Sequence, residues 1–297
     1  MSFQASSRLL HVRLPIVFWF GLVLWQALIV PACQAQVVRI APKANACDPA
    51  LVDAAMEVSS LKYFGKLMSA EINPMFAQME QGLRAQGKRL LPEDRNRIFE
   101  MMAQAFAAEA VDEEVLRSIR SHCEPKVFAV AVEQLRTPLA TRVRGFEDQF
   151  SRSHSPSAVN HYAASLQQHP PTETREALID AMEKTVHQAD FTADLDAHVI
   201  VALYMGLSGK ATDDNQLSAI REQILPAARK GTRIEYMMIY RSLTDEELDQ
   251  YIMLLRIPEL QRFQTISKSA VQNAVIRRSE VLAAMIKQHI DSRAARH

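Results

Sequence analysis

The tetrapeptide Leu-Arg-x-Pro occurs twice in this chain, at 135–138 and again 120 residues later at 255–258. Apolar residues precede and follow each copy at spacings of three, four and seven, which is the pattern of a helix with one buried face. A proline ends one helix and can begin the next, because it lacks a backbone N–H and its φ is fixed. The repeat therefore predicts two similar helix–elbow–helix units, at 119–146 and 239–266.

The rest of the composition favours helix over strand. Only 8 of the 297 residues are glycine, helix-forming residues abound, and no run of β-branched residues alternates with polar ones. We predict an all-α bundle with two similar helical halves, 36–150 and 172–297, joined by a connector at 151–171 that is rich in Ser, His, Gln and Pro. A long C-terminal helix is expected to start near Glu259, with its apolar stripe continuing to Met285.

Residues 1–35 have the layout of a secretory signal peptide. Arg8 and Arg13 give a basic start, a long apolar run follows, and small residues close the segment. We expect cleavage after Ala35 and a periplasmic or secreted mature protein. Two alternatives stay open: a retained membrane anchor, although the run is shorter than the roughly 20 residues of a spanning helix, and a membrane-anchored lipoprotein acylated at Cys33.

Cys47 and Cys123 are the two cysteines that remain once the signal peptide and Cys33 are removed. An oxidising compartment outside the cytoplasm favours pairing them, so we expect a Cys47–Cys123 disulfide. The alternative is two separate buried thiols.

The charge balance excludes two classes of partner. The chain has 34 Lys and Arg against 34 Asp and Glu, with both signs interspersed. This distribution gives neither the basic face of a nucleic-acid-binding protein nor a polybasic membrane anchor. After the signal peptide no stretch is apolar enough to cross a bilayer, so we expect no transmembrane segment in the mature chain.

A capped helix start precedes the second elbow. Residues 244–248 read Thr-Asp-Glu-Glu-Leu, and the elbow proline follows at Pro258. This arrangement, from Tyr240 to Val275, resembles the exported bacterial family known as domain of unknown function 2059, with a weaker first copy from Phe128 to Phe146. Two elbow positions depart from the family pattern: Ile257 stands in place of serine and Leu260 in place of glycine. The resemblance implies a helical module of the cell envelope and implies no activity.

Motifs that carry catalysis or bind metals are missing from the sequence. There is no HExxH, GxSxG or CxxC motif, and Gly206 to Lys210 has the wrong spacing for a phosphate-binding loop. Acidic residues between Asp190 and His198 are expected to open a helix rather than to bind a cation. Five histidines lie in the middle of the chain: His154, His161, His169, His187 and His198. We expect no metal site, no cofactor and no enzymatic activity.

Two pairs of arginines occupy equivalent positions of the repeat: Arg136 with Arg256, and Arg142 with Arg262. Each guanidinium could hold a carboxylate or phosphate of a ligand, or could tie the elbow to nearby carbonyls and glutamates. The sequence thus favours a non-catalytic module that binds a small molecule or a protein of the cell envelope, with a crevice between the halves near Arg136 and Arg256. The alternative is an envelope enzyme that uses carboxylates and histidines in a pocket between the halves.

Overall fold

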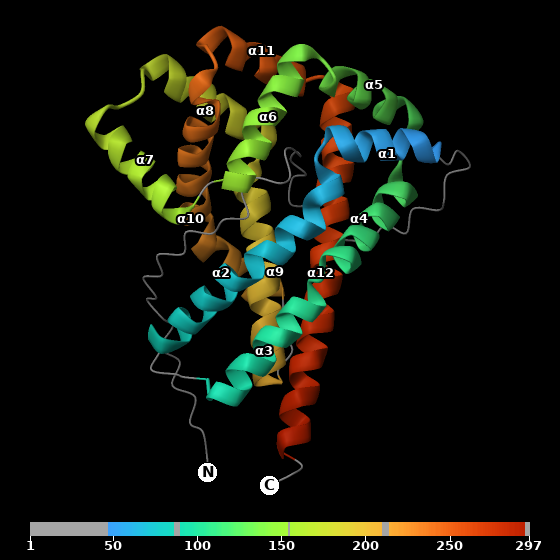
Figure 1. Ribbon diagram of the computed structural model, residues 1–297, viewed down its shortest axis with the longest axis vertical. Coiled ribbons are helices and arrows are strands. Elements are labelled where there is room, and N and C mark those ends of the chain that lie inside the picture. The colour runs from blue at the N-terminus through green and yellow to red at the C-terminus, as the bar shows by residue number, and fades with distance from the viewer. Residues whose placement is uncertain (1–46, 86–89, 154, 210–213, 295–297) are drawn as a thin grey trace.

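The structure, a computed structural model, describes residues 47–85, 90–153, 155–209 and 214–294. The predicted signal peptide, with Cys33, and His154 lie outside these ranges. Within them the chain is helical and contains no strand, which confirms the all-α prediction (Figure 1). None of the described helices combines the length and the apolar character that a bilayer-spanning helix needs.

The described helices fall into an N-terminal segment, a connecting helix and a C-terminal segment. The N-terminal segment contains α1 (Pro49–Val58), α2 (Phe64–Ala85), α3 (Pro92–Ala105), α4 (Ala108–His122), α5 (Pro125–Leu135) and α6 (Pro138–Ser153). The connecting helix is α7 (Pro156–Gln168). The C-terminal segment contains α8 (Glu173–Val186), α9 (Gln188–Ser208), α10 (Asp214–Ile239), α11 (Asp245–Leu255) and α12 (Pro258–Ala294). Short 3₁₀ turns precede α2 and α11, at Leu61–Tyr63 and Tyr240–Ser242.

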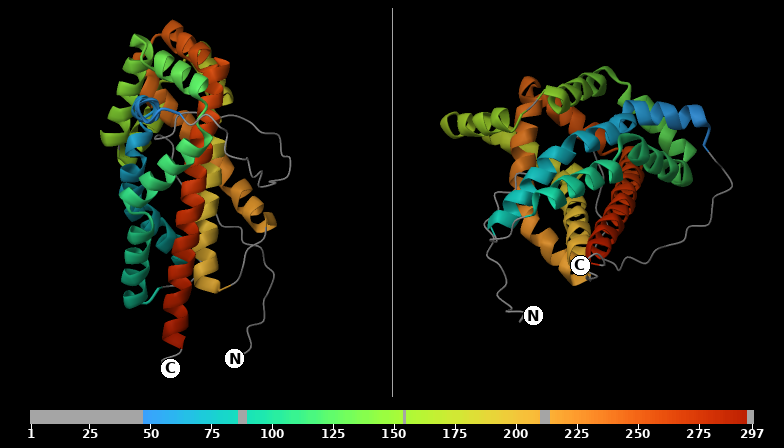
Figure 2. Two further views of the ribbon diagram at one scale, coloured as in Figure 1. Left: turned by 90° about the vertical axis from the view of Figure 1, so that its right-hand side faces the viewer. Right: turned by 60° about the horizontal axis from the view of Figure 1, so that its bottom comes forward.

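Helix α12 is the longest element and organises the bundle. It lies alongside α9 and also packs against α3, α4 and α5, as the views in Figures 1 and 2 show. The two helices run in the same direction, because Lys268 contacts the start of α9 and Ile286 lies against Gly206 near its end. The C-terminal helix is therefore docked along most of its length, with an apolar face that is buried from Phe263 to Ile286.

The two elbows have the same local structure. Arg136 and Arg256 end the preceding helices with nearly equal backbone angles, φ −89° and ψ −4° for the first and φ −81° and ψ −3° for the second. Positions 131–140 and 251–260 show the same order of buried, half-buried and exposed residues. The apolar stripes beside the elbows, which include Phe128 and Leu248, are buried.

The turn between α1 and α2 resembles the turn between α8 and α9. Each contains a non-glycine residue in the left-handed region, Ser60 with φ 58° and His187 with φ 51°. In each case a cation donates to the carbonyl of the last residue of the helix before this turn, α1 or α8. The cation belongs to the helix that follows the elbow of the same segment, α6 or α12. The two contacts are Arg144 Nη1 to Val58 O at 2.8 Å and Lys268 Nζ to Val186 O at 2.7 Å.

In each segment a tether, by which we mean one bond, joins the start of the first helix to the loop before the helix that precedes the elbow. In the N-terminal segment Cys47 and Cys123 form a disulfide, with their Cα atoms 6.0 Å apart, and it joins the start of α1 to the loop before α5. In the C-terminal segment Arg175, in the first turn of α8, donates to the carbonyl of Leu243 before α11 at 2.6 Å. A covalent bond in one segment thus corresponds to a charge-assisted hydrogen bond in the other.

Candidate functional site

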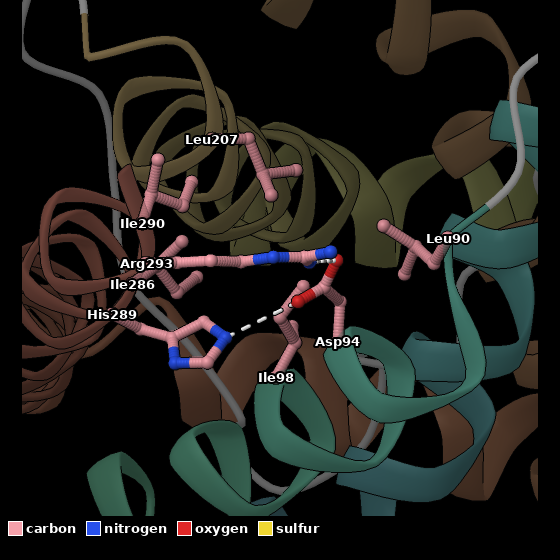
Figure 3. A pocket seen from close by; sticks show the side chains of 8 residues that line it. All are labelled: Leu90, Asp94, Ile98, Leu207, Ile286, His289, Ile290 and Arg293. Carbon is pink, nitrogen blue, oxygen red and sulfur yellow. Dashed lines mark hydrogen bonds and ion pairs between the residues drawn. The ribbon is translucent and has the colours of Figure 1, made fainter. Parts of the chain in front are cut away.

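A pocket of about 360 Å³ lies where the ends of α9 and α12 meet the start of α3 (Figure 3). Its aliphatic wall is formed by Leu90, Ile98, Leu207, Ile286 and Ile290. Its polar side is formed by Asp94, His289 and Arg293. A concave surface that is largely apolar, with a few polar groups at one side, is the usual composition of a small-molecule site.

The close approach of α9 and α12 places these walls. Gly206 has no side chain, and a Cβ atom there would lie 2.8 Å from Cβ of Ile286. The next residue, Leu207, therefore reaches the same cavity as Ile286 and Ile290 from the facing helix. Helix α3 begins with Pro92, which brings Asp94 into its first turn, where it lines the cavity.

Asp94 joins α3 to the last turns of α12. One oxygen of its carboxylate accepts from Arg293 Nη1, and the other lies 3.3 Å from His289 Nε2. Partial burial opposes ionisation of Asp94, but the hydrogen bonds from Arg293 and His289 outweigh it, so the pKa of this carboxyl lies below its ordinary value. The negative charge sits in the first turn of α3 and the positive charge in the last turn of α12, where the helix dipoles favour them.

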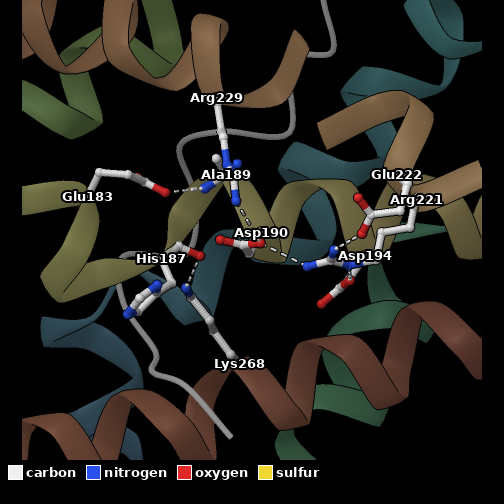
Figure 4. Close-up of polar contacts among 9 residues, drawn as sticks. All are labelled: Glu183, His187, Ala189, Asp190, Asp194, Arg221, Glu222, Arg229 and Lys268. Atoms are coloured by element: carbon white, nitrogen blue, oxygen red, sulfur yellow. Dashed lines mark hydrogen bonds and ion pairs between the residues drawn. The ribbon is translucent and has the colours of Figure 1, made fainter. Parts of the chain in front are cut away.

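A second polar cluster lies at the turn between α8 and α9 (Figure 4). The Lys268 ammonium is buried and donates to the carbonyls of Val186 and His187 at 2.7 and 3.2 Å. Burial lowers the pKa of Lys268 to about 7, and burial raises the pKa of Glu183 to about 7. Glu183 also accepts from the backbone N–H of Ala189 at 2.9 Å. These contacts hold the left-handed turn together, which is a structural role.

The acidic residues of α9 have two different environments. Asp190 and Asp194 form ion pairs with Arg221 of α10, at 2.8 and 2.5 Å. Asp196 points inward instead, is fully buried, and neither of its oxygens has a hydrogen-bond partner in the described structure. Burial raises the pKa of Asp196 well above its ordinary value. The expectation that all these acids serve the start of a helix holds for Asp190, in the first turn, and is wrong for Asp196.

The four described histidines of the mid-chain set lie on α7 and α9 and at the ends of these helices. His161 and His169 are exposed on and after α7, and His198 has Nδ1 2.7 Å from the carbonyl of Asp194. Within the described ranges, no three His, Cys, Asp or Glu side chains gather closely enough to hold a metal ion.

Two of the predicted arginines link the two segments reciprocally. Arg142 of α6 pairs with Glu247 in the first turn of α11. Arg262 of α12 pairs with Glu124, the residue that caps the start of α5, at 2.6 Å. Each arginine thus contacts the start of the first elbow helix in the other segment, where a glutamate also suits the helix dipole.

The other two predicted arginines lie at the elbows themselves. Arg256 Nε donates to Thr185 Oγ1 at 3.3 Å, and Arg136 is exposed. The aliphatic pocket lies at the opposite end of α12, so the structure does not bring these arginines together with it. Ligand binding at Arg136 and Arg256 remains a prediction.

Sequence reasoning missed the polar side of the pocket. Asp94 and Arg293 are separated by 199 residues, and neither belongs to a recognisable motif. Only the packing of α12 along α3 shows what Asp94 contacts.

Comparisons with known proteins give no relative for this chain. No protein-family model matches it, and neither the curated proteins nor the solved structures contain a match. The resemblance of Tyr240 to Val275 to the family of unknown function therefore stays a prediction, and the functional argument depends on the geometry.

Proposed function

We propose that this protein is an exported, non-catalytic binding module and that its site is the aliphatic pocket between α3, α9 and α12. The pocket itself carries the proposal: its volume of about 360 Å³ and its five aliphatic side chains suit a small apolar molecule. The alternative, an envelope enzyme, has less support, because the Asp94 carboxylate is already paired with Arg293 and its lowered pKa makes it a weak general base.

We also propose that the N-terminal and C-terminal segments are copies of one helical unit. The equal elbows, the two left-handed turns, the equivalent tethers and the reciprocal arginine–glutamate pairs support this relation. In that alignment α6 corresponds to the first part of α12, so the end of α12 has no counterpart. This extension carries Ile286, His289, Ile290 and Arg293. The pocket would thus be an addition to a duplicated scaffold.

Export is proposed from the layout of residues 1–35, and the Cys47–Cys123 disulfide supports it independently because such bonds persist in oxidising compartments. We expect protein recovered from the periplasm to begin at Gln36 or at an acylated Cys33. Intact mass and N-terminal sequencing measure this directly. Both tryptophans of the chain lie before residue 36, so the processed protein should also show no tryptophan emission. An uncleaved chain found only in the cytoplasm would contradict the proposal.

A single tryptophan placed in the pocket tests binding. Ile290 lines the pocket and is 37% exposed, so Ile290→Trp should fold and report on the cavity. Decanol, a neutral aliphatic probe, is expected to shift the emission of the introduced tryptophan to shorter wavelength in a saturable way. The hydrocarbon chain of decanol displaces water from the indole ring. Tyr204→Trp is the matched control, since Tyr204 is 46% exposed on α9 and does not line the pocket. Equal shifts in both variants, or no shift in either, would argue against this site.

A further inference from the structure

We infer that the pocket takes an aliphatic acid: an extended hydrocarbon chain in the cavity with its carboxylate on the Arg293 guanidinium. This inference rests on the proposed function and adds the chemical class of the ligand. Three features of the pocket support it: the composition of its wall, the count of its hydrogen-bonding groups and the position of Arg293.

The wall favours a flexible chain over a ring system. All of its apolar members are leucine or isoleucine, and the described lining contains no aromatic ring on which a planar ligand could stack. The volume of about 360 Å³ is near the lower end of the range for ligand sites, about 300–1,000 Å³. A chain of medium length therefore fits better than a long lipid or a sterol-like molecule.

The polar side offers more donors than acceptors. Arg293 has five N–H donors and Asp94 accepts from one of its nitrogens, while Glu93 lies at 3.7 Å from another. Both oxygens of Asp94 already face Arg293 and His289. A ligand with an acceptor head can satisfy the remaining donors, whereas an ammonium head would meet a guanidinium that never loses its charge.

The position of Arg293 brings these donors close to the hydrocarbon chain of the ligand. Figure 3 shows its side chain extending from α12 across the pocket to Asp94 on α3. In Figure 3 Leu207 and Ile98 lie on opposite sides of this side chain, so a ligand chain that packs against either residue would lie alongside Arg293. The start of α3 favours negative charge, and a ligand carboxylate would join Asp94 and Glu93, which already lie in its first turn. Guanidinium and carboxylate can pair through two parallel hydrogen bonds, which fixes the head as well as attracting it.

Calorimetry with three probes of equal chain length tests the head group. Decanoate is expected to bind the processed wild-type protein about tenfold more tightly than decanol, because a charge-assisted hydrogen bond replaces a neutral one. Decylammonium is expected to bind more weakly than decanol. All three are used below their micelle-forming concentrations. Binding of decanol that equals or exceeds that of decanoate would overturn the inference and leave the proposed function intact, whereas failure of all three probes to bind would overturn both.

Two variants should change this preference in opposite directions. Arg293→Gln should bind decanoate no more tightly than it binds decanol. Asp94→Asn should bind decanoate several-fold more tightly, because the carboxylate that competes for Arg293 is gone. Arg277→Gln, on an exposed position of the same helix and outside the pocket, is the control and should match the wild type. A preference for decanoate that survives in Arg293→Gln, or that falls in Asp94→Asn, would overturn the assignment of the head to Arg293.

Discussion

Replacing Cys47 and Cys123 together by serine is expected to lower the free energy of unfolding by about 4 kcal/mol. The disulfide joins residues that are 76 apart in the sequence, and a loop of this length loses much chain entropy when it is closed in the unfolded state. Denaturation by urea, monitored by circular dichroism, measures the difference at constant m-value. The same loss should appear when the wild-type protein is treated with a reductant.

The tether of the C-terminal segment provides the comparison. Arg175→Ala removes the hydrogen bond to Leu243 and an ion pair with Asp245 at 2.8 Å, and should cost about 1–2 kcal/mol. This substitution leaves the entropy of the unfolded chain unchanged, because the contact exists only in the folded state. A double serine variant no less stable than Arg175→Ala would show that the disulfide adds little beyond the packing around it.

Glu235→Gln is expected to remove a large part of the pH dependence of stability. Glu235 is 3% exposed on α10, and burial together with the nearby Glu71 carboxylate raises its pKa to about 8, against 4.5 ordinarily. The folded protein therefore keeps a proton that the unfolded chain has lost between these values. The contribution of Glu235 to the free energy of unfolding is fully present below about pH 4.5. It falls as pH rises toward 8, by up to about 4 kcal/mol.

Comparison with the wild type isolates this group from its neighbours. Glu183 and Lys268 titrate near neutral pH with opposite effects, but they are present in both proteins. At pH 5 the variant and the wild type should have similar free energies of unfolding, and at pH 8.5 the variant should be more stable. Glu222→Gln, an exposed change on the same helix, should follow the wild type at both values. Parallel curves for Glu235→Gln and the wild type would contradict the expectation.

The elbows could be predicted because their causes are local. A proline at 138 or 258 ends one helix and starts the next wherever the rest of the chain lies, and an apolar stripe beside it identifies the buried face. The start of the C-terminal helix was predicted near Glu259 and lies at Pro258 for the same reason. The predicted stripe, which continues to Met285, includes Leu282, which is buried. The adjacent Val281 is 39% exposed, because neighbouring residues are about 100° apart on a helix.

The candidate site could not be predicted because its contacts are distant in sequence. Arg142 and Arg262 were identified as a pair, but their glutamate partners come from the opposite segment. Asp196 was expected to open a helix, whereas the packing of α9 in the middle of the bundle buries it. Burial of this kind depends on which helices surround α9, and helical periodicity alone does not contain that information.

Gly206 has a consequence for how this sequence can vary during evolution. At most helical positions an exchange of glycine for alanine is favourable, because alanine is the better helix former. At 206 the added methyl group would meet Cβ of Ile286 at 2.8 Å and the carbonyl of Ala283 at 3.2 Å, so α12 would have to move away from α9. The width of the cavity is thus set by a residue that no ligand would touch, and relatives that keep the pocket should keep this glycine even where the lining residues exchange leucine for isoleucine.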